Sequence, residues 1–203
     1  MTSSRILLSA AFVVTMTHAV QAQPPKPDAV ALIDAKVLQE ISDWINTDIV
    51  RVTIDAQNKR YDKLEASSIA SLDSQWTQER ESADKPLIAA TLSNPLSVYL
   101  SRMQGRSLGL YAEIFVMDQN GLNVGQSAIT SDFWQGDEDK FLKTFKVSGD
   151  AVFLDEPEFD SDFGIWRTQV SMTVVDPKAA IPIGAVTVEM NLTELERRSV
   201  SGT

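Results

Sequence analysis

The sequence contains no cysteine and only one histidine, His18, in 203 residues. Without thiols the chain forms neither disulfides nor Cys-ligated zinc or iron–sulfur sites. One histidine near the N-terminus leaves no basis for a Ser-His or Cys-His triad or for a histidine metal site. The chemistry that remains open uses carboxylate pairs, Lys, Tyr or oxygen ligands for hard metals. We therefore expect no catalytic residues, no enzyme activity and no cofactor.

Basic residues are also scarce, with 18 Lys and Arg against 28 Asp and Glu, so the formal charge is -10. Because proteins bind nucleic acids largely by neutralising phosphates, this balance argues against a DNA or RNA partner. The 43% of hydrophobic and 23% of charged residues are typical of a globular chain. A chain of this length is one domain of ordinary size or two very small ones.

The chain lacks any apolar run long enough to span a bilayer as a stable anchor. Its longest run, Ile6 to Met16, follows Arg5 and precedes the small-residue segment ending at Ala22. These are the three parts of a secretory signal peptide. We predict that residues 1–22 are removed and that the product is soluble in the periplasm or secreted, with a charge of -11 after loss of Arg5. An uncleaved anchor is the alternative.

Glycine is missing from the first half of the chain, since all nine glycines lie between Gly105 and Gly202. Residues 23–27 form a Pro-rich leader, and residues 28–85 contain neither Gly nor Pro, which favours helix. Apolar residues then recur at steps of three and four, which predicts one long amphipathic helix. This stripe comprises Val30, Ile33, Val37, Ile41, Trp44, Ile45, Ile49 and Val52. Such a face packs on a sheet, and it also suits a homodimer.

Asn94 is the predicted N-cap of a short helix that ends at Gly105, and Asn191 is the predicted N-cap of a closing helix to Arg198. After Gly105 the sequence changes to the two-residue period of strands. Tyr111 to Asp118 predicts a central strand that turns at Gly121 into a returning strand. A short strand at 151–154 and a long pair at 165–175 and 183–190 complete five strands. The expected fold is a single α+β domain, residues 28–203. Its helical part, 28–93, packs a long N-terminal helix on the five-stranded antiparallel sheet of its sheet part, 94–203.

Three segments of the sheet part together resemble the PDC sensor domains, also called Cache domains, which are PAS-like extracytoplasmic ligand-binding modules. They are YAEIFVMDQNGLNVGQSAITSDFWQGDEDKF, AVFLDEPEFD and IPIGAVTVEMNL. The resemblance spans residues 94–192 and implies a small-molecule-binding sensory module of the single Cache type. The membrane helices that flank most such domains are missing, so it implies a separate membrane receptor or kinase as partner. The Arg-Trp-Tyr signature of amino-acid-binding members is missing as well.

Two segments carry the expected ligand-binding residues. Residues 166–174 alternate apolar and polar side chains, so Arg167 and Gln169 share one face of a strand. That face is either exposed to solvent or turned inward under a loop, where Arg167 would bind a carboxylate or phosphate. In residues 131–137, Trp134 is either buried or an aromatic wall for the ligand. The set is completed by Asp118, Asp132 and Asp137, which suit an amine ligand or cap turns, and by Tyr111.

An acidic run, residues 150–162, follows without a single Lys or Arg. Alternating carboxylates bind calcium in some proteins, but the Gly that an EF-hand loop requires is displaced by Phe163. We therefore expect a solvated acidic loop and no metal site. Two other functions compete with ligand sensing. One is a periplasmic accessory subunit that binds protein through the long helix and the acidic loop, and the other is a carboxylate-dependent hydrolase.

Overall fold

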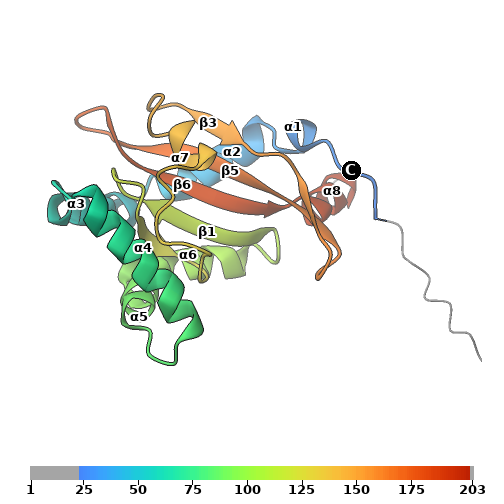
Figure 1. Cartoon of the computed structure of the whole chain (residues 1–203). Helices are drawn as coiled ribbons and strands as arrows, with labels where there is room; N and C mark the ends of the chain where they lie inside the picture. Colours follow the sequence, from blue (N-terminus) through green and yellow to red (C-terminus); the bar gives the residue numbers. More distant parts are fainter. Residues whose placement is uncertain (1–22, 202–203) are drawn as a thin grey trace, which may run out of the picture.

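The chain folds around one antiparallel sheet, and the computed structural model describes residues 23–201 of it. The expected signal peptide lies outside the described residues. Five strands follow the spatial order β2-β1-β6-β5-β3, and the short strand β4 also pairs with β5 (Figure 1). The strands are β1 Tyr111–Met117, β2 Asn123–Gln126, β3 Val152–Leu154, β4 Glu158–Asp160, β5 Ile165–Asp176 and β6 Ile181–Asn191. The α+β class with an antiparallel sheet is confirmed, and β4 is a sixth strand that the acidic run did not predict.

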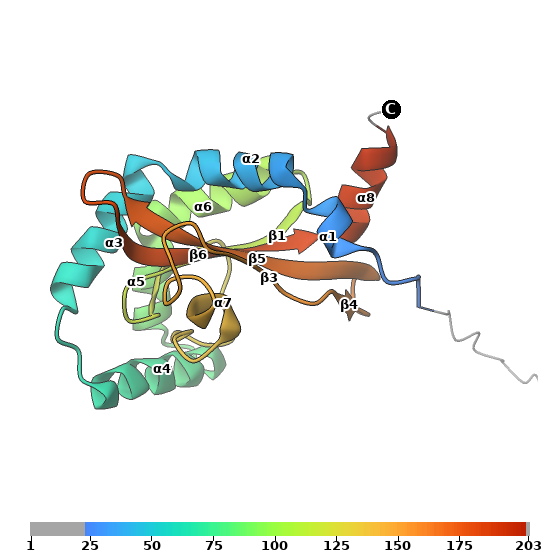
Figure 2. The same ribbon diagram turned by 90° about the horizontal axis from the view of Figure 1, so that it is seen from above.

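Helices lie on both sides of this sheet. Helices α2 and α6 cover one side and α7 covers the other, with α4 farther out on that second side (Figure 2). We call the first side the helix face and the second the α7 face. The bounds are α1 Ala29–Leu32, α2 Ala35–Ile45, α3 Asp48–Arg60, α4 Ala66–Glu81, α5 Pro86–Ser93, α6 Pro95–Arg106, α7 Asp139–Leu142 and α8 Leu192–Ser201. No helix in residues 23–201 has the length and apolar character to cross a membrane.

The long N-terminal helix expected from the sequence is divided into α1, α2 and α3, which corrects that expectation. Asp34 interrupts it because its carboxylate accepts a hydrogen bond from the Val37 amide and starts a new helix. At the second break the Asn46 side chain bonds back to Ser42, and Thr47 has an extended backbone. Part of the predicted apolar stripe faces the sheet, since Ile33, Ile41, Trp44 and Ile45 are buried in the main core. Val30 and Val52 are exposed instead, and α3 contributes Val50 and Ile54 to the core.

A second, smaller core holds α4 and α5 against the β1–β2 turn. Trp76 of α4 stacks on Phe133 with ring centroids 5.2 Å apart, and its indole donates to the Thr130 carbonyl at 3.0 Å. Ile88 and Leu122 are buried in the same cluster. The N-terminus of α5 is held by Glu79, whose carboxylate accepts from the Ile88 amide at 2.9 Å. This core fixes α4 beside the segment that covers the α7 face.

Local signals in the sheet part are matched closely by the structure. Asn94 caps α6 through the Ser97 amide, and Asn191 caps α8 through the Glu194 amide, both as predicted. The turn at Gly121 has a positive φ of 80°, a conformation that glycine adopts without strain. The long β5–β6 hairpin is also as predicted. Strand β6 inserts between β5 and β1, so the sheet is not a simple succession of neighbouring hairpins.

Candidate functional site

Strand β5 presents two chemically different faces, as its alternating sequence predicts. Trp166 and Val170 are buried in the main core on the helix face. Arg167 and Gln169 point the other way, toward the α7 face, where they line a hollow. The inward orientation that the sequence left open is therefore the one that the structure shows.

The residues between β2 and β3, 127–151, cover the α7 face, and we call them the capping segment. Phe141 of α7 anchors this segment in a small apolar cluster with Phe115, Met117 and Ala185 of the sheet. The preceding residue, Lys140, reaches over the Phe115 ring at 5.4 Å from its centroid. The anchored helix thus forms a roof that leaves space beside it along β5 and β6.

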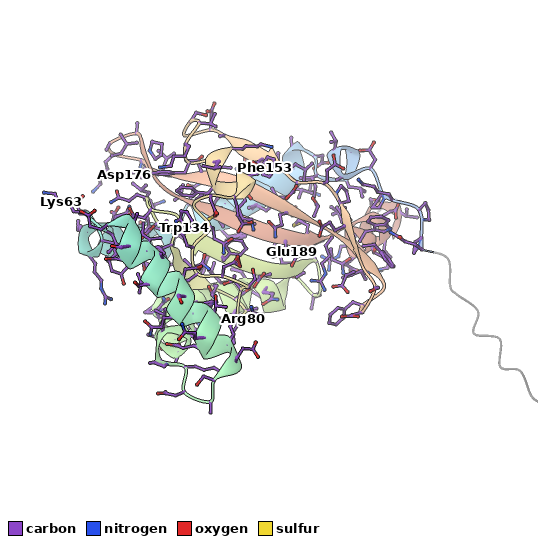
Figure 3. The ribbon with its side chains drawn as sticks, viewed as in Figure 1. Lys63, Arg80, Trp134, Phe153, Asp176 and Glu189 are labelled. Carbon is purple, nitrogen blue, oxygen red and sulfur yellow. The ribbon has the colours of Figure 1, made fainter. Side chains whose placement is uncertain are left out.

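The space under this roof is a hollow of about 230 Å³. Its walls come from α7, from β5 and β6, and from part of the acidic run. They comprise Glu138, Lys140, Asp155, Glu156, Glu158, Arg167, Thr168, Gln169 and Glu189. Figure 3 shows Glu189 on the sheet, well separated from Trp134 beside α4. The acidic run is thus partly a wall of the hollow and partly strand β4, rather than a wholly solvated loop.

Arg167 lies in the hollow with its charge already paired. Its guanidinium contacts the Asp160 carboxylate, and a second nitrogen lies 3.5 Å from the Glu189 carboxylate. The ring of Phe163 lies over the guanidinium, 5.3 Å away. Only the buried Nε has no hydrogen-bond partner in residues 23–201. The sequence suggested that Arg167 would bind an anionic ligand. In the structure it can do so only if the ligand displaces one of these carboxylates.

Three acceptor groups form a row across the sheet next to Arg167. Gln169 of β5 pairs with Glu189 of β6, and Glu189 pairs on its other side with Glu113 of β1. We call these three residues the acceptor row. The Gln169 Oε1 atom is buried without a hydrogen-bond partner among the described residues. Within the same part of the chain the Glu113 carboxylate makes neither a hydrogen bond nor an ion pair, so two of the three acceptors are unused.

The charged forms of the two carboxylates in the acceptor row are disfavoured in the folded protein. Burial, reinforced by the negative charge of Glu189, raises the pKa of Glu113 to about 7, against the attraction of Lys140 and Arg167. Burial also raises the pKa of Glu189, although Arg167 favours its charged form. The shift of Glu113 means that the folded protein resists holding two carboxylate charges side by side. Glu189 lines the hollow and Glu113 lies next to it on β1, and perturbed carboxylates at a hollow are typical of functional sites.

The other expected site residues are used elsewhere in the fold. Asp118 is fully buried, and its carboxylate accepts from the Asn120 and Leu122 amides and from Gln57, so it caps the β1–β2 turn. Tyr111 lies on the helix face, with its ring centroid 6.0 Å from that of Trp44. The structure therefore does not bring these two residues to the hollow.

The aromatic loop is also built for packing. Trp134 donates from its indole to the Asn120 carbonyl at 2.9 Å and packs on the second core. The Asp132 carbonyl accepts from the side chains of Asn123 in β2 and of Thr130 and Gln135 in the loop, and its carboxylate contacts the neighbouring Ser131 hydroxyl. Asp137 is exposed. None of the three lines the hollow, although Gly136 and Trp134 lead directly into α7.

Sequence reasoning missed Glu113, Glu189 and Lys140. A signal was present, because Glu113 and Glu189 are the only charged residues in strands that are otherwise mostly apolar. A lone carboxylate in such a strand requires either a partner or a ligand. In residues 23–201 no group of three or more acidic or histidine side chains is arranged to hold a metal ion.

Comparison with known proteins gives structural neighbours only, since no family model and no curated protein matches the chain. The ligand-binding domain of the Pseudomonas aeruginosa PAO1 amino acid chemoreceptor PctC, solved in complex with GABA, is 16% identical, with a TM-score of 0.35. The match covers 79% of this chain and 62% of that one. The sensory domain of the Campylobacter jejuni chemoreceptor Tlp3 is 14% identical over 80% and 65% of the two chains, with a TM-score of 0.39.

A third neighbour is the sensor domain of the V. cholerae histidine kinase DctB, at 18% identity and a TM-score of 0.37, over 72% and 59% of the chains. The chain thus spans about three fifths to two thirds of the length of these neighbours. They are sensor domains of chemoreceptors and of a histidine kinase. At these TM-scores the likeness carries no information about the ligand or the site.

Proposed function

We propose that the protein is an exported sensory module that binds a small organic molecule in the hollow between β5, β6 and the capping segment. One observation carries this proposal: Arg167 Nε and Gln169 Oε1 are buried at the hollow without hydrogen-bond partners in the described chain. An unsatisfied buried polar atom costs about 1–3 kcal/mol. A ligand that supplies a donor to Gln169 Oε1 or an acceptor to Arg167 Nε recovers part of that energy on binding. The module acts by binding, without catalysis.

A thermal-shift screen tests the proposal with organic acids, amines and amino acids as probes. A ligand that binds only the folded state raises the melting temperature by mass action. The substitution Gln169→Leu removes the unused acceptor and is expected to reduce the shift strongly. The matched control is Gln78→Leu, which alters an exposed glutamine of α4 far from the hollow. If no probe shifts the wild-type protein, the competing function, a protein-binding accessory subunit, is favoured.

Export and domain organisation belong to the same proposal. We propose that residues 1–22 are removed as a signal peptide and that residues 28–203 form one sensor domain. N-terminal sequencing of the protein recovered from the periplasm or the medium is expected to begin at Gln23. Recovery of a membrane-bound chain that begins at Met1 contradicts this.

We also propose that the module signals through a separate membrane receptor or kinase and forms a homodimer through its N-terminal helices. Support for the dimer comes from two apolar side chains on this region, Val30 and Val52, which are 77% and 64% exposed. Light scattering during size-exclusion chromatography is expected to report a dimer that Val52→Lys weakens. A monomeric wild-type protein contradicts the dimer and leaves ligand binding untouched.

A further inference from the structure

Resting on the proposed ligand-binding function, we infer that the ligand carries a primary ammonium group and that the acceptor row receives it, through Gln169 and Glu189 in the wall of the hollow and through Glu113, which lies next to Glu189 on β1. The hollow therefore selects a small organic amine over an anion of similar size. The inference thus names the chemical class of the ligand, a primary amine, and the group that the protein recognises, its ammonium.

The geometry of the row fits such a group. Residues directly paired in an antiparallel sheet have Cβ atoms about 4.5–5.5 Å apart, so three neighbours on one face form a compact line. Glu189 is in register with Gln169 on one side and with Glu113 on the other. An ammonium group offers three N–H donors and no acceptor. An amide oxygen and two carboxylates supply three acceptors, so each donor finds a partner.

The charges around the hollow exclude an anion as the natural occupant. Arg167 is engaged by Asp160 and Glu189, and Lys140 lies 2.9 Å from Glu138. An anion at Arg167 would have to displace Asp160 or Glu189, whose side chains are only partly exposed, and leave that carboxylate without its cation, which is costly. The remaining wall residues that carry charge are the carboxylates Asp155, Glu156 and Glu158. Of these, Glu156 is paired with Lys26 at 2.6 Å.

A cationic ligand, by contrast, leaves the existing ion pairs intact and stabilises the acceptor row. It separates the charges of Glu113 and Glu189 by placing a positive group between them, and Coulomb attraction is stronger in a partly buried site than in water. The buried Gln169 Oε1 then gains the donor that it lacks. The hollow, at about 230 Å³, is smaller than most drug-sized pockets. It suits a short-chain amine rather than a large or strongly apolar one.

Four probes with the same number of carbons separate the alternatives by calorimetry at pH 8: n-butylamine, 1,4-diaminobutane, butanoate and butanedioate. Both amines are protonated at this pH, since alkyl ammonium groups titrate near pH 10. We expect the amines to bind and the two carboxylates not to bind. Glu113→Gln keeps the side-chain shape and removes one charge, and it is expected to weaken amine binding at least about tenfold. Glu189→Gln is expected to do the same.

The control is Glu81→Gln, which removes one negative charge at an exposed end of α4 and is expected to leave amine affinity within about twofold. Amine binding that survives both Glu113→Gln and Glu189→Gln overturns the inference, because the ammonium then lies elsewhere. Binding of butanoate or butanedioate in place of the amines also overturns it, while the proposed ligand-binding function stands. If the folded protein binds none of the four probes, the inference fails, and the broader thermal-shift screen decides the proposed function separately.

Discussion

Glu113 on β1 and Glu189 on β6 are directly paired across the antiparallel ladder, with their carboxylates on the same face of the sheet. Like charges directly opposite each other destabilise a sheet. A single hydrophobic substitution at either position would remove the repulsion. A disfavoured arrangement of this kind, with Glu189 in the wall of the hollow, is typical of functional sites.

The stability of the protein is expected to depend on pH through Glu113. Its pKa is about 7 in the folded protein, above the ordinary value of 4.5, so the folded state binds the proton more tightly than the unfolded state. This contribution is complete below about pH 4.5 and is lost as the pH rises through 7. We expect Glu113→Gln to be more stable than wild type at pH 8 by on the order of 2 kcal/mol, with the difference disappearing near pH 5. Urea unfolding at both pH values measures it.

Glu189 and Asp118 also have raised pKa values and contribute to the wild-type pH profile in the same direction. The comparison between wild type and Glu113→Gln therefore isolates one carboxylate from the rest. Equal pH dependence of the two proteins would show that Glu113 is ionised in the folded state throughout this range.

Amine binding is expected to release a proton near neutral pH. Below about pH 7 the free protein holds a proton on Glu113, and that proton must leave before the carboxylate can accept from an ammonium group. Affinity for 1,4-diaminobutane is therefore expected to fall by up to about tenfold per pH unit below 7 and to level off above pH 8. Calorimetry in buffers of different ionisation enthalpy counts the released protons. In Glu113→Gln this pH dependence should flatten.

Replacing Arg167 is expected to affect folding as well as binding. Asp160 and Glu189 both lose their cation in Arg167→Met, and the side chains of these carboxylates are only 22% and 20% exposed. We expect a loss of about 1–3 kcal/mol in the free energy of unfolding, measured in urea. Arg106→Met, an exposed site at the end of α6, is expected to change stability by less than about 0.5 kcal/mol. Equal stability of the two variants would contradict this expectation. The ion pairs of Arg167 would then contribute nothing to folding, and its charge would be free to bind an anionic ligand.

Asp73 of α4 holds the capping segment in place. Its carboxylate accepts from the backbone amides of Phe133 and Trp134, both at 2.9 Å. Asp73→Ala leaves two amides without partners and is expected to cost about 1–3 kcal/mol. Amide hydrogen exchange in the capping segment should rise in this variant, whereas Asp62→Ala, at an exposed site beyond α3, should leave it unchanged. Unchanged hydrogen exchange in Asp73→Ala would show that other contacts, and not Asp73, keep the capping segment in place.

Two glycines give opposite outcomes on substitution by alanine. A Cβ on Gly184 of β6 would collide with the Met117 carbonyl of β1, so Gly184→Ala must push the strands apart. We expect it to cost about 1–3 kcal/mol. Gly105 lies inside α6 with open space around it, and Gly105→Ala is expected to stabilise by about 0.5–1 kcal/mol. Thermal unfolding compares the two, and a neutral Gly184→Ala would contradict the tight contact.

Features with a local cause were predictable from the sequence. A cap such as Asn94, or a turn such as the one at Gly121, is decided by residues a few positions apart, and both are present as predicted. The break at Asp34 was missed because an acidic residue on the polar side of a helix and an N-cap have the same sequence appearance. Its distinguishing hydrogen bond to Val37 exists only in the folded chain.

The acceptor row depends on long-range pairing, which a single sequence does not reveal. Glu113 and Glu189 become neighbours only because β6 inserts beside β1 in one particular register. A shift of β6 by one residue would turn Glu189 to the helix face and leave Glu113 without it. Arg167 was found because its signal, the alternation along β5, is local. Trp134 was ambiguous because an aromatic residue in a loop has the same sequence whether it is packed or lines a pocket.

Strand β6 continues into α8 without an intervening loop, and α8 projects away from the sheet beside α1 (Figure 2). The Arg198 guanidinium of α8 donates to the carbonyls of Ser107 and Leu108, in the turn that leads into β1. The helix is therefore attached to both strands that carry the carboxylate pair. Chain continuity on β6 and the hydrogen-bonded turn before β1 thus join α8 to both carboxylates of the pair at the end of the sheet where the chain leaves β6.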